Sequence, residues 1–287
     1  MQYKNSYLRH LRNQRIFRTV ICIIFCLISL LPFVILCMNA TRTSEAIQSG
    51  LSLIPSTHFL ENWKNLMAKQ NGMQITLQKA CLNSLIITVP GTILSVYFSS
   101  MTAYGVHVYD FKLKKYAWAF IMAVMMVPSQ ISIIGFYRFM LQLGLIDTYI
   151  PLIIPTIATP TVVFFMKQYM ESILSIEMIE AARIDGSGEL RTFNRVVLPI
   201  LEPAVATQAI FQFIAQWNNL FTPTVILTTD SKKTLPMFVQ LLSSNQFRTD
   251  YGVVYVGLFV AIIPLVIVYL ILSKYIVAGV ALGGVKG

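Results

Sequence analysis

The sequence has little charge. Only 12% of its 287 residues are Asp, Glu, Lys or Arg, whereas an ordinary soluble domain carries about 25%. Hydrophobic residues make up 56% of the chain, and the mean hydropathy is +0.67. Because disorder requires low hydrophobicity and high net charge, this composition excludes a disordered chain as well as a water-soluble globule.

Residue types that bind metals or perform catalysis are also scarce. The four cysteines lie in apolar stretches, where we interpret them as packing residues rather than metal ligands or disulfide partners. The three histidines occur singly, and no GxxxxGK[ST] sequence for binding ATP is present. We therefore expect no catalytic residue, no metal site and no cofactor. The residues concerned are Cys22, Cys26, Cys37, Cys81, His10, His58 and His107.

Long apolar runs are abundant instead. Six stretches are free of Asp, Glu, Lys and Arg and long enough to cross about 30 Å of hydrocarbon. They predict an all-α, polytopic membrane protein with six transmembrane helices. The first run is long and lacks a small-residue cleavage site, so we interpret it as a retained helix rather than a signal peptide. The runs cover residues 19–38, 81–106, 116–137, 149–166, 203–229 and 251–273.

The basic residues predict the direction of insertion. Placing the N-terminus in the cytoplasm puts 14 of the 22 Lys and Arg residues on that side, as the positive-inside rule favours. Both termini are then cytoplasmic, with an N-terminal segment 1–18, a six-helix region 19–273 and a tail 274–287. The net charge of +10 therefore indicates topology, and we expect no nucleic acid as partner.

The predicted spans contain no ionisable residue, although carriers driven by ions or protons use such groups at membrane depth. A self-powered carrier is therefore disfavoured, and so is a membrane-embedded enzyme with paired carboxylates. The polar residues present are neutral, and three glutamines recur every fourth residue on one helix face. They suit a hydrated path for an uncharged solute or hydrogen bonds between helices, and both interpretations stay open. The candidate path consists of Gln208, Gln212, Gln216 and Asn218.

One loop, residues 167–202, differs from the rest because it holds many of the charged residues. Ser175 is a plausible N-cap with Glu177 in the first turn, and a short helix is predicted from there to Asp185. Gly186 is expected to end it in the left-handed conformation, and a second helix should end at Leu198-Pro199. Two short helices with an apolar stripe predict a knob that fills a cleft on a soluble partner, rather than a solvated loop.

This loop resembles a known family. EAARIDGSGELRTFNRVVLPILEP is similar to the EAA signature of permease subunits in ATP-binding-cassette importers. NSLIIT, WNNLFTPTVIL, TLPMF and the tail GVALGGVKG resemble, in order, other segments of the carbohydrate-uptake branch, and specifically the shorter six-span partner of the maltose-type pair. A proline that the family carries before the first coupling helix is missing around Ser175, and Ser187 replaces an alanine.

The resemblance implies roles for the matched positions. The loop would dock into a groove of the ATPase subunit, Lys286 and Gly287 in the tail would reach between two ATPase subunits, and the external loop 230–250 would contact the solute-binding protein. The implied coupling residues are Glu180, Ala181, Ala182, Asp185, Gly186, Gly188, Leu198 and Pro199.

We accordingly expect a non-enzymatic permease subunit in the bacterial plasma (inner) membrane. Its partners would be membrane lipid, a second homologous permease, two ATP-binding ATPase subunits, an extracytoplasmic sugar-binding protein and the sugar or oligosaccharide itself. A permease for peptides, phosphate or amino acids is the alternative within the class. Charged solutes should leave a charged residue in the path, and the spans have none.

Overall fold

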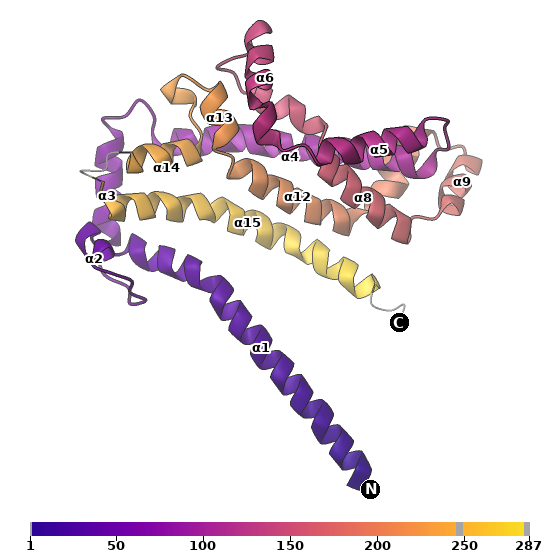
Figure 1. Cartoon of the computed structure of the whole chain (residues 1–287), viewed down its shortest axis with the longest axis horizontal. Helices are drawn as coiled ribbons and strands as arrows, with labels where there is room; N and C mark the ends of the chain where they lie inside the picture. The colour runs from indigo at the N-terminus through magenta and orange to yellow at the C-terminus, as the bar shows by residue number, and fades with distance from the viewer. Residues whose placement is uncertain (1, 245–248, 284–287) are drawn as a thin grey trace. The chain divides into compact units, whose positions relative to one another are not determined.

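The computed structural model describes residues 2–244 and 249–283, and within them every regular element is helical (Figure 1). The all-α fold expected from the apolar runs is confirmed. The chain divides into two compact units, one of residues 1–69 and 242–260 and the other of residues 70–241 and 261–287.

The first unit holds α1 (Gln2–Ala40), α2 (Ser44–Gln48), nearly all of α3 (Phe59–Gln70) and the start of α15 (Tyr251–Gly283). The rest of α15 belongs to the second unit. The other helices of the second unit are α4 (Leu77–Val108), α5 (Lys114–Met125), α6 (Ser129–Gln142), α7 (Ile150–Ile153), η1 (Ile154–Ile157), α8 (Pro160–Ile173), α9 (Ile176–Ile184), α10 (Glu189–Thr192), η2 (Phe193–Val197), α11 (Leu198–Ile200), α12 (Glu202–Trp217), α13 (Phe221–Ile226), η3 (Asp230–Lys232) and most of α14 (Leu235–Ser243).

Four helical segments are long and apolar enough to cross a membrane, and two bent helix pairs raise the number to as many as six within the described residues. The upper number agrees with the six predicted spans, although the second bent pair, Glu189–Trp217, begins in the charged loop and not at residue 203. Helix α1 continues without a break across residue 18, so no helix end marks the predicted start of the first span. The four segments are Arg12–Ala40, Leu77–Val108, Ile150–Ile173 and Tyr251–Tyr275.

The third predicted span is not one straight helix. It is divided into α5 and α6, whose axes differ by 101°. The break falls before Pro128, which caps α6 with a ψ of 121°. A proline disfavours helical backbone at the residue before it and donates no hydrogen bond, so α5 ends at Met125.

The fifth predicted span is interrupted as well. Helix α12 ends at Trp217, and α13 begins at Phe221. Between them the side chain of Asn219 accepts a hydrogen bond of 3.2 Å from the backbone N–H of Thr222. Short polar side chains compete in this way with helical hydrogen bonds, which explains a break within an apolar run.

In the first unit, α3 packs closely against the start of α15. A Cβ atom added at Gly252 would lie 2.6 Å from the Asn62 side chain, so this contact requires glycine. The amide of Asn62 also donates to the backbone oxygens of Ala40 and Arg42, at 3.0 and 2.9 Å. One asparagine therefore joins the end of α1 and the following turn to the helix that carries it.

In the second unit, α4 packs against α8 and α12. The packed face of α4 includes Ser95, Ser99 and Ala103, all fully buried. Small residues allow membrane helices to approach closely. Ser95 also donates to the Thr159 hydroxyl at 2.8 Å, beside the start of α8. The charged loop and a cavity, described below, both contact these packed helices.

Candidate functional site

The predicted charged loop, residues 167–202, starts within a helix. Helix α8 continues through Lys167 to Ile173, and the Leu174 N–H closes its last turn on the Met170 oxygen at 2.8 Å. Ser175 lies at the predicted N-cap position with extended backbone, but its side chain makes no capping hydrogen bond, and α9 runs from Ile176 to Ile184.

Gly186 ends α9 in the predicted left-handed conformation, with φ of 78°. Its N–H donates to the Arg183 oxygen and the Ser187 N–H donates to the Ala182 oxygen, both at 3.0 Å. These two bonds define a Schellman motif, which satisfies carbonyl groups that the helix end leaves free. The chain then reverses, and Gly188 caps α10.

The prediction that Leu198-Pro199 ends the second short helix is off by one residue, since the helix ends at Ile200. The chain stays helical from α10 through the π-turn η2 and α11 as far as Ile200. The Leu198 N–H bonds to the Phe193 oxygen, five residues back. Pro199 is the second residue of α11 and has no N–H to donate to the preceding turn. The chain instead turns by 83° between Ile200 and Glu202, where α12 begins.

One face of the loop is anchored to the membrane helices. Ile179, Phe193 and Val197 are essentially fully buried, in a cluster with Met166 and Met170 of α8. Tyr104 of α4 belongs to the same cluster, and its ring lies 5.5 Å from that of Phe193. The loop therefore cannot move freely of α4 and α8 without exposing apolar surface.

The opposite face of the loop is exposed. Ile184 is 86% exposed and Leu190 is 67% exposed. The residues matched to the EAA signature lie on or beside this face: Glu180, Ala181, Asp185, Gly186, Gly188 and Pro199 are exposed, and Ala182 and Leu198 are half-buried.

A cluster around Glu189, which the sequence analysis missed, fixes the loop to the end of α4. Its carboxylate accepts bonds from the Arg183 Nε at 2.8 Å, from the Tyr104 hydroxyl at 3.2 Å and from the Tyr109 hydroxyl. The Arg183 bond, followed by that of Tyr109, lowers the pKa of Glu189 below its ordinary value. We call these four residues the Glu189 clasp. Tyr104 and Tyr109 are about 80 residues from Glu189 in sequence, so no local sequence pattern indicates the clasp.

A cavity of about 750 Å³ lies within the second unit. Its polar lining is neutral throughout, and Phe136 and Phe139 contribute aromatic surface. Neutral hydrogen-bonding groups beside aromatic rings suit an uncharged, hydroxyl-rich solute. The polar lining residues are Ser84, Thr88, Ser132, Thr156, Gln216, Asn219, Thr222 and Thr234.

Of the four candidate path residues, Gln216 alone lines this cavity. Both polar atoms of its amide are buried and have no hydrogen-bond partner among the described residues. Its oxygen contacts the place that a Cβ atom of residue 91 would fill, so Gly91 makes room for it. A buried amide without partners is costly, and a solute in the cavity would relieve that cost.

The other three candidates lie elsewhere. Asn218 lines a second hollow of about 470 Å³ beside Gln130 and Asn219. Gln208 is buried and Gln212 half-buried, and neither lines either space. Lys286 and Gly287 lie outside the described residues. Within residues 2–244 and 249–283, no group of three or more His, Cys, Asp or Glu side chains is placed to hold a metal ion.

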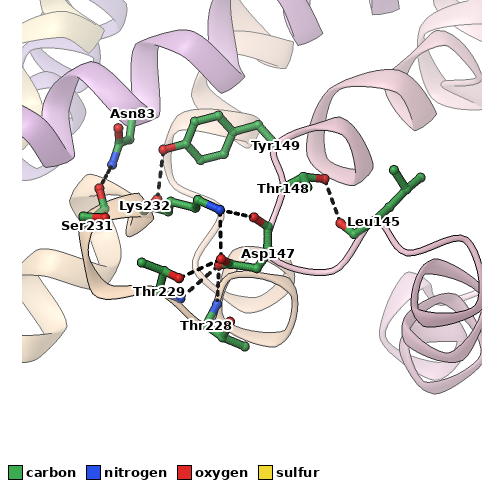
Figure 2. A network of polar contacts seen from close by, with 9 residues as sticks. All are labelled: Asn83, Leu145, Asp147, Thr148, Tyr149, Thr228, Thr229, Ser231 and Lys232. Atoms are coloured by element: carbon green, nitrogen blue, oxygen red, sulfur yellow. Dashed lines mark hydrogen bonds and ion pairs between the residues drawn. The ribbon is translucent and has the colours of Figure 1, made fainter.

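A second carboxylate cluster joins two loops near the other end of α4 (Figure 2). Asp147 accepts bonds from the backbone N–H groups of Thr228 and Thr229, at 3.0 and 2.9 Å, and from the Thr229 hydroxyl at 2.7 Å. The Lys232 ammonium lies 2.8 Å from the same carboxylate. These contacts, led by Lys232, hold the pKa of Asp147 well below its usual range. We call these residues the Asp147 clasp.

The Asp147 clasp is connected to α4. The Asn83 amide donates to the backbone oxygens of Ser231 and Lys233, each at 2.9 Å, and the contact to Ser231 is drawn in Figure 2. The Ser84 hydroxyl accepts a bond of 2.8 Å from the Leu235 N–H. One helix thus contacts a clasp near each of its ends.

The described residues thus combine broken helices long and apolar enough to cross a membrane with an exposed loop between two of them. The comparisons identify the family. Residues 95–281 match the family described as "Binding-protein-dependent transport system inner membrane component". The chain belongs to this family.

Similar proteins have been named for sugars. The chain is 33% identical to the arabinooligosaccharides transport system permease protein AraQ of Bacillus subtilis (strain 168), over 98% of this chain and 100% of that protein. It is 28% identical to the melibiose/raffinose/stachyose import permease protein MelC of the same strain, over 96% and 98%. A crystal structure of a bacterial ABC transporter that imports the acidic polysaccharide alginate has the same fold, with a TM-score of 0.75, 24% identity and coverage of 92% of this chain and 96% of that chain.

Proposed function

We propose that this chain is one of two homologous membrane subunits of an ATP-driven importer for an uncharged sugar or oligosaccharide. An extracytoplasmic binding protein would deliver the solute. The names of the related permeases support the substrate class. The observation that carries the proposal is the neutral cavity with the amide of Gln216, which has no partner among the residues that the structure describes. A sugar hydroxyl both donates and accepts hydrogen bonds and can pair with both amide atoms.

The second part of the proposal concerns the charged loop, which would dock into a groove of a soluble ATPase subunit of the same importer. Its buried face is continuous with α4 and α8, while the face with Glu180, Ala181 and Gly186 is exposed. A knob fixed to the spans on one side and open on the other can transmit a rigid-body movement. Closing of two ATPase subunits around ATP would then switch the spans between inward-facing and outward-facing arrangements.

For the solute path, we propose Gln216 and Asn218, which line the two hollows. Gln208 and Gln212, on the same helix face as Gln216, would instead contribute contacts between helices. This division refines the sequence interpretation, in which the four residues had equal standing.

We further propose a plasma (inner) membrane location with both termini in the cytoplasm, on the basis of the distribution of Lys and Arg. The six-helix region would span residues 19–273. The external loop 230–250 would face the binding protein, and the tail with Lys286 and Gly287 would reach between the two ATPase subunits.

Labelling from one side of the membrane tests this orientation. Single cysteines would replace Ser187, in the charged loop, and Ser244, in the external loop, in a chain without other cysteines. An impermeant maleimide added to intact cells should label only the cysteine at 244. Labelling of the cysteine at 187 in intact cells would contradict the orientation and the docking role together.

The substrate class is tested by uptake of labelled sugars into cells that carry or lack this chain. Replacing Gln216 by Leu should lower uptake per assembled complex about two- to twelve-fold, the equivalent of one hydrogen bond of about 0.5–1.5 kcal/mol. It should not lower the melting temperature, because it removes an unpartnered buried amide. Gln212→Leu is the matched control and should leave uptake unchanged. Equal loss of uptake in both variants, or loss of stability alone in Gln216→Leu, would contradict the assigned path.

A further inference from the structure

A third hollow, of about 370 Å³, lies where the end of α4, the loop after it, the start of α5 and the middle of α8 meet. Figure 1 shows α5 and α8 beside this end of α4. Four of the lining residues are lysines and one is an aspartate, and the remainder are apolar or aromatic. The lining consists of Val106, Asp110, Phe111, Lys112, Lys114, Lys115, Trp118 and Lys167.

Two of the residues that line this hollow, Trp118 and Lys167, are held by contacts with residues of α8 and with each other. The Trp118 ring stacks on Phe164 of α8, with ring centres 6.2 Å apart and planes inclined by 18°. The Lys167 ammonium lies 4.6 Å from the centre of the Trp118 ring, and its side chain is only 13% exposed. Lys167 also pairs with Glu171, which in turn accepts a bond from Gln168 at 3.0 Å.

The other three lysines have no such partner. Among the described residues, no carboxylate lies within ion-pair distance of Lys112, Lys114 or Lys115. Lys114 contacts the backbone oxygen of His107 at 3.4 Å. Asp110 is the single acid in the lining, so positive charge is left without compensation.

The position of the hollow indicates what compensates it. Helices α4 and α8 are membrane spans, and the hollow lies at the end of α4. Leu113 and Tyr116 beside it are 65% and 71% exposed, as expected for side chains that contact lipid. Lysines and aromatic rings at the end of a span lie at the depth of lipid headgroups. Basic pockets between spans at this depth bind anionic headgroups.

We propose that this hollow binds the headgroup phosphate of an anionic phospholipid. Lys112, Lys114 and Lys115 would pair with the phosphate, while Trp118 and Val106 would contact the glycerol and the first methylene groups. The exposed apolar neighbours favour a lipid over a free phosphate ion, which has nothing to place against them. The proposal is independent of the solute that the chain transports.

The test uses the full chain, in the complex in which it purifies, in nanodiscs of phosphatidylcholine with rising fractions of dibrominated phosphatidylglycerol. Bromine quenches nearby tryptophan, and the signal of Trp118 is the difference between the wild type and Trp118→Phe. Half-maximal quenching should need a lower fraction of brominated phosphatidylglycerol than of brominated phosphatidylcholine. The double variant Lys114→Gln, Lys115→Gln should raise that fraction about tenfold.

Two matched variants complete the design. Lys64→Gln with Lys79→Gln removes the same charge from exposed positions elsewhere and should change nothing, whereas Lys114→Arg with Lys115→Arg should keep the preference. Equal quenching by the two lipids, or the same shift in the Lys64 and Lys79 variant, would overturn the site. Displacement of the brominated lipid by millimolar inorganic phosphate would show that a free ion is the ligand and would overturn the assignment to lipid.

Discussion

The Asp147 clasp and the Glu189 clasp each fix a loop to the membrane helices, but with different hydrogen-bond donors. In each, a glycine with positive φ precedes a carboxylate by three residues: Gly144 before Asp147, and Gly186 before Glu189. Each carboxylate then collects several donors and has a lowered pKa. A tight turn followed by an acid is thus used twice to fix a loop to the spans.

The difference lies in the donors. Asp147 takes two backbone N–H groups in addition to side chains and is itself held at a φ of 62°. Glu189 takes side chains alone, and 45% of its side chain is exposed. Backbone donors cannot rotate away, whereas arginine and tyrosine side chains can. The Asp147 clasp is therefore the more rigid of the two, whereas the Glu189 clasp depends on side chains that can rearrange.

The largest expected effect is on the Asp147 clasp. Asp147→Ala leaves two backbone N–H groups and the Thr229 hydroxyl without their acceptor, and Lys232 keeps only the backbone oxygen of residue 147. Hydrogen bonds to charged groups contribute about 1.5–3 kcal/mol each without being additive. We expect the complex to lose at least about 2 kcal/mol of stability, measured by thermal unfolding in detergent. Asp110→Ala, at an exposed position, is the control. Equal melting temperatures for the two variants would show that the clasp is not structural.

Substitutions at Gly144 and Gly186 distinguish the effect of backbone strain on stability from an effect on the coupling of ATP hydrolysis to transport. Valine at Gly144 or at Gly186 should cost about 1–2 kcal/mol, the penalty for a branched residue in the left-handed conformation. Open space surrounds both positions, so no collision adds to this cost. Only Gly186→Val should reduce the sugar transported per ATP hydrolysed, because only that turn orients the proposed docking knob. Normal coupling in Gly186→Val, with wild-type yield of the complex, would contradict the docking role.

A smaller effect is expected at the exposed clasp. Glu189→Gln removes the ion pair with Arg183 but keeps an oxygen that Tyr109 can donate to, and exposed ion pairs contribute little. The melting temperature should fall by no more than about 3 °C. Coupling of ATP hydrolysis to transport should fall more in Glu189→Ala than in Glu189→Gln. A larger loss of stability at Glu189 than at Asp147 would reverse the comparison drawn above.

The smallest effect is expected from mild acid. Both carboxylates have lowered pKa values in the folded chain, so their contributions are complete above the ordinary pKa near 4 and are lost as the pH falls further. Lowering the pH from 7 to 5 should therefore open neither clasp. Below about pH 4 the melting temperatures of Asp147→Asn and the wild type should converge. A difference in melting temperature that stays constant from about pH 5 to about pH 3 would show that the pKa of Asp147 is not lowered.

Much of the fold was predictable because it depends on local chemistry. Apolar length identified the spans, and the glycine at 186 identified the end of α9. The errors occurred where proline and asparagine act through their surroundings. Pro199 was expected to end a helix, but it lies within α11, directly after the π-turn η2. Asn219 interrupts an apolar run because its side chain accepts a hydrogen bond from the Thr222 N–H.

From the sequence alone it could be concluded that this is a membrane protein, because that follows from composition. Its class and the position of the loop with the EAA signature followed from the resemblance of short, contiguous motifs. Only the tertiary structure decided which side chains act together. Gln208, Gln212 and Gln216 are equivalent as a repeat, yet packing of α12 against Gly91 of α4 places only Gln216 at the cavity. Glu189 meets Tyr104 and Tyr109 because α4 and the loop are buried in one apolar cluster, and contacts between residues so far apart are set by packing and not by spacing.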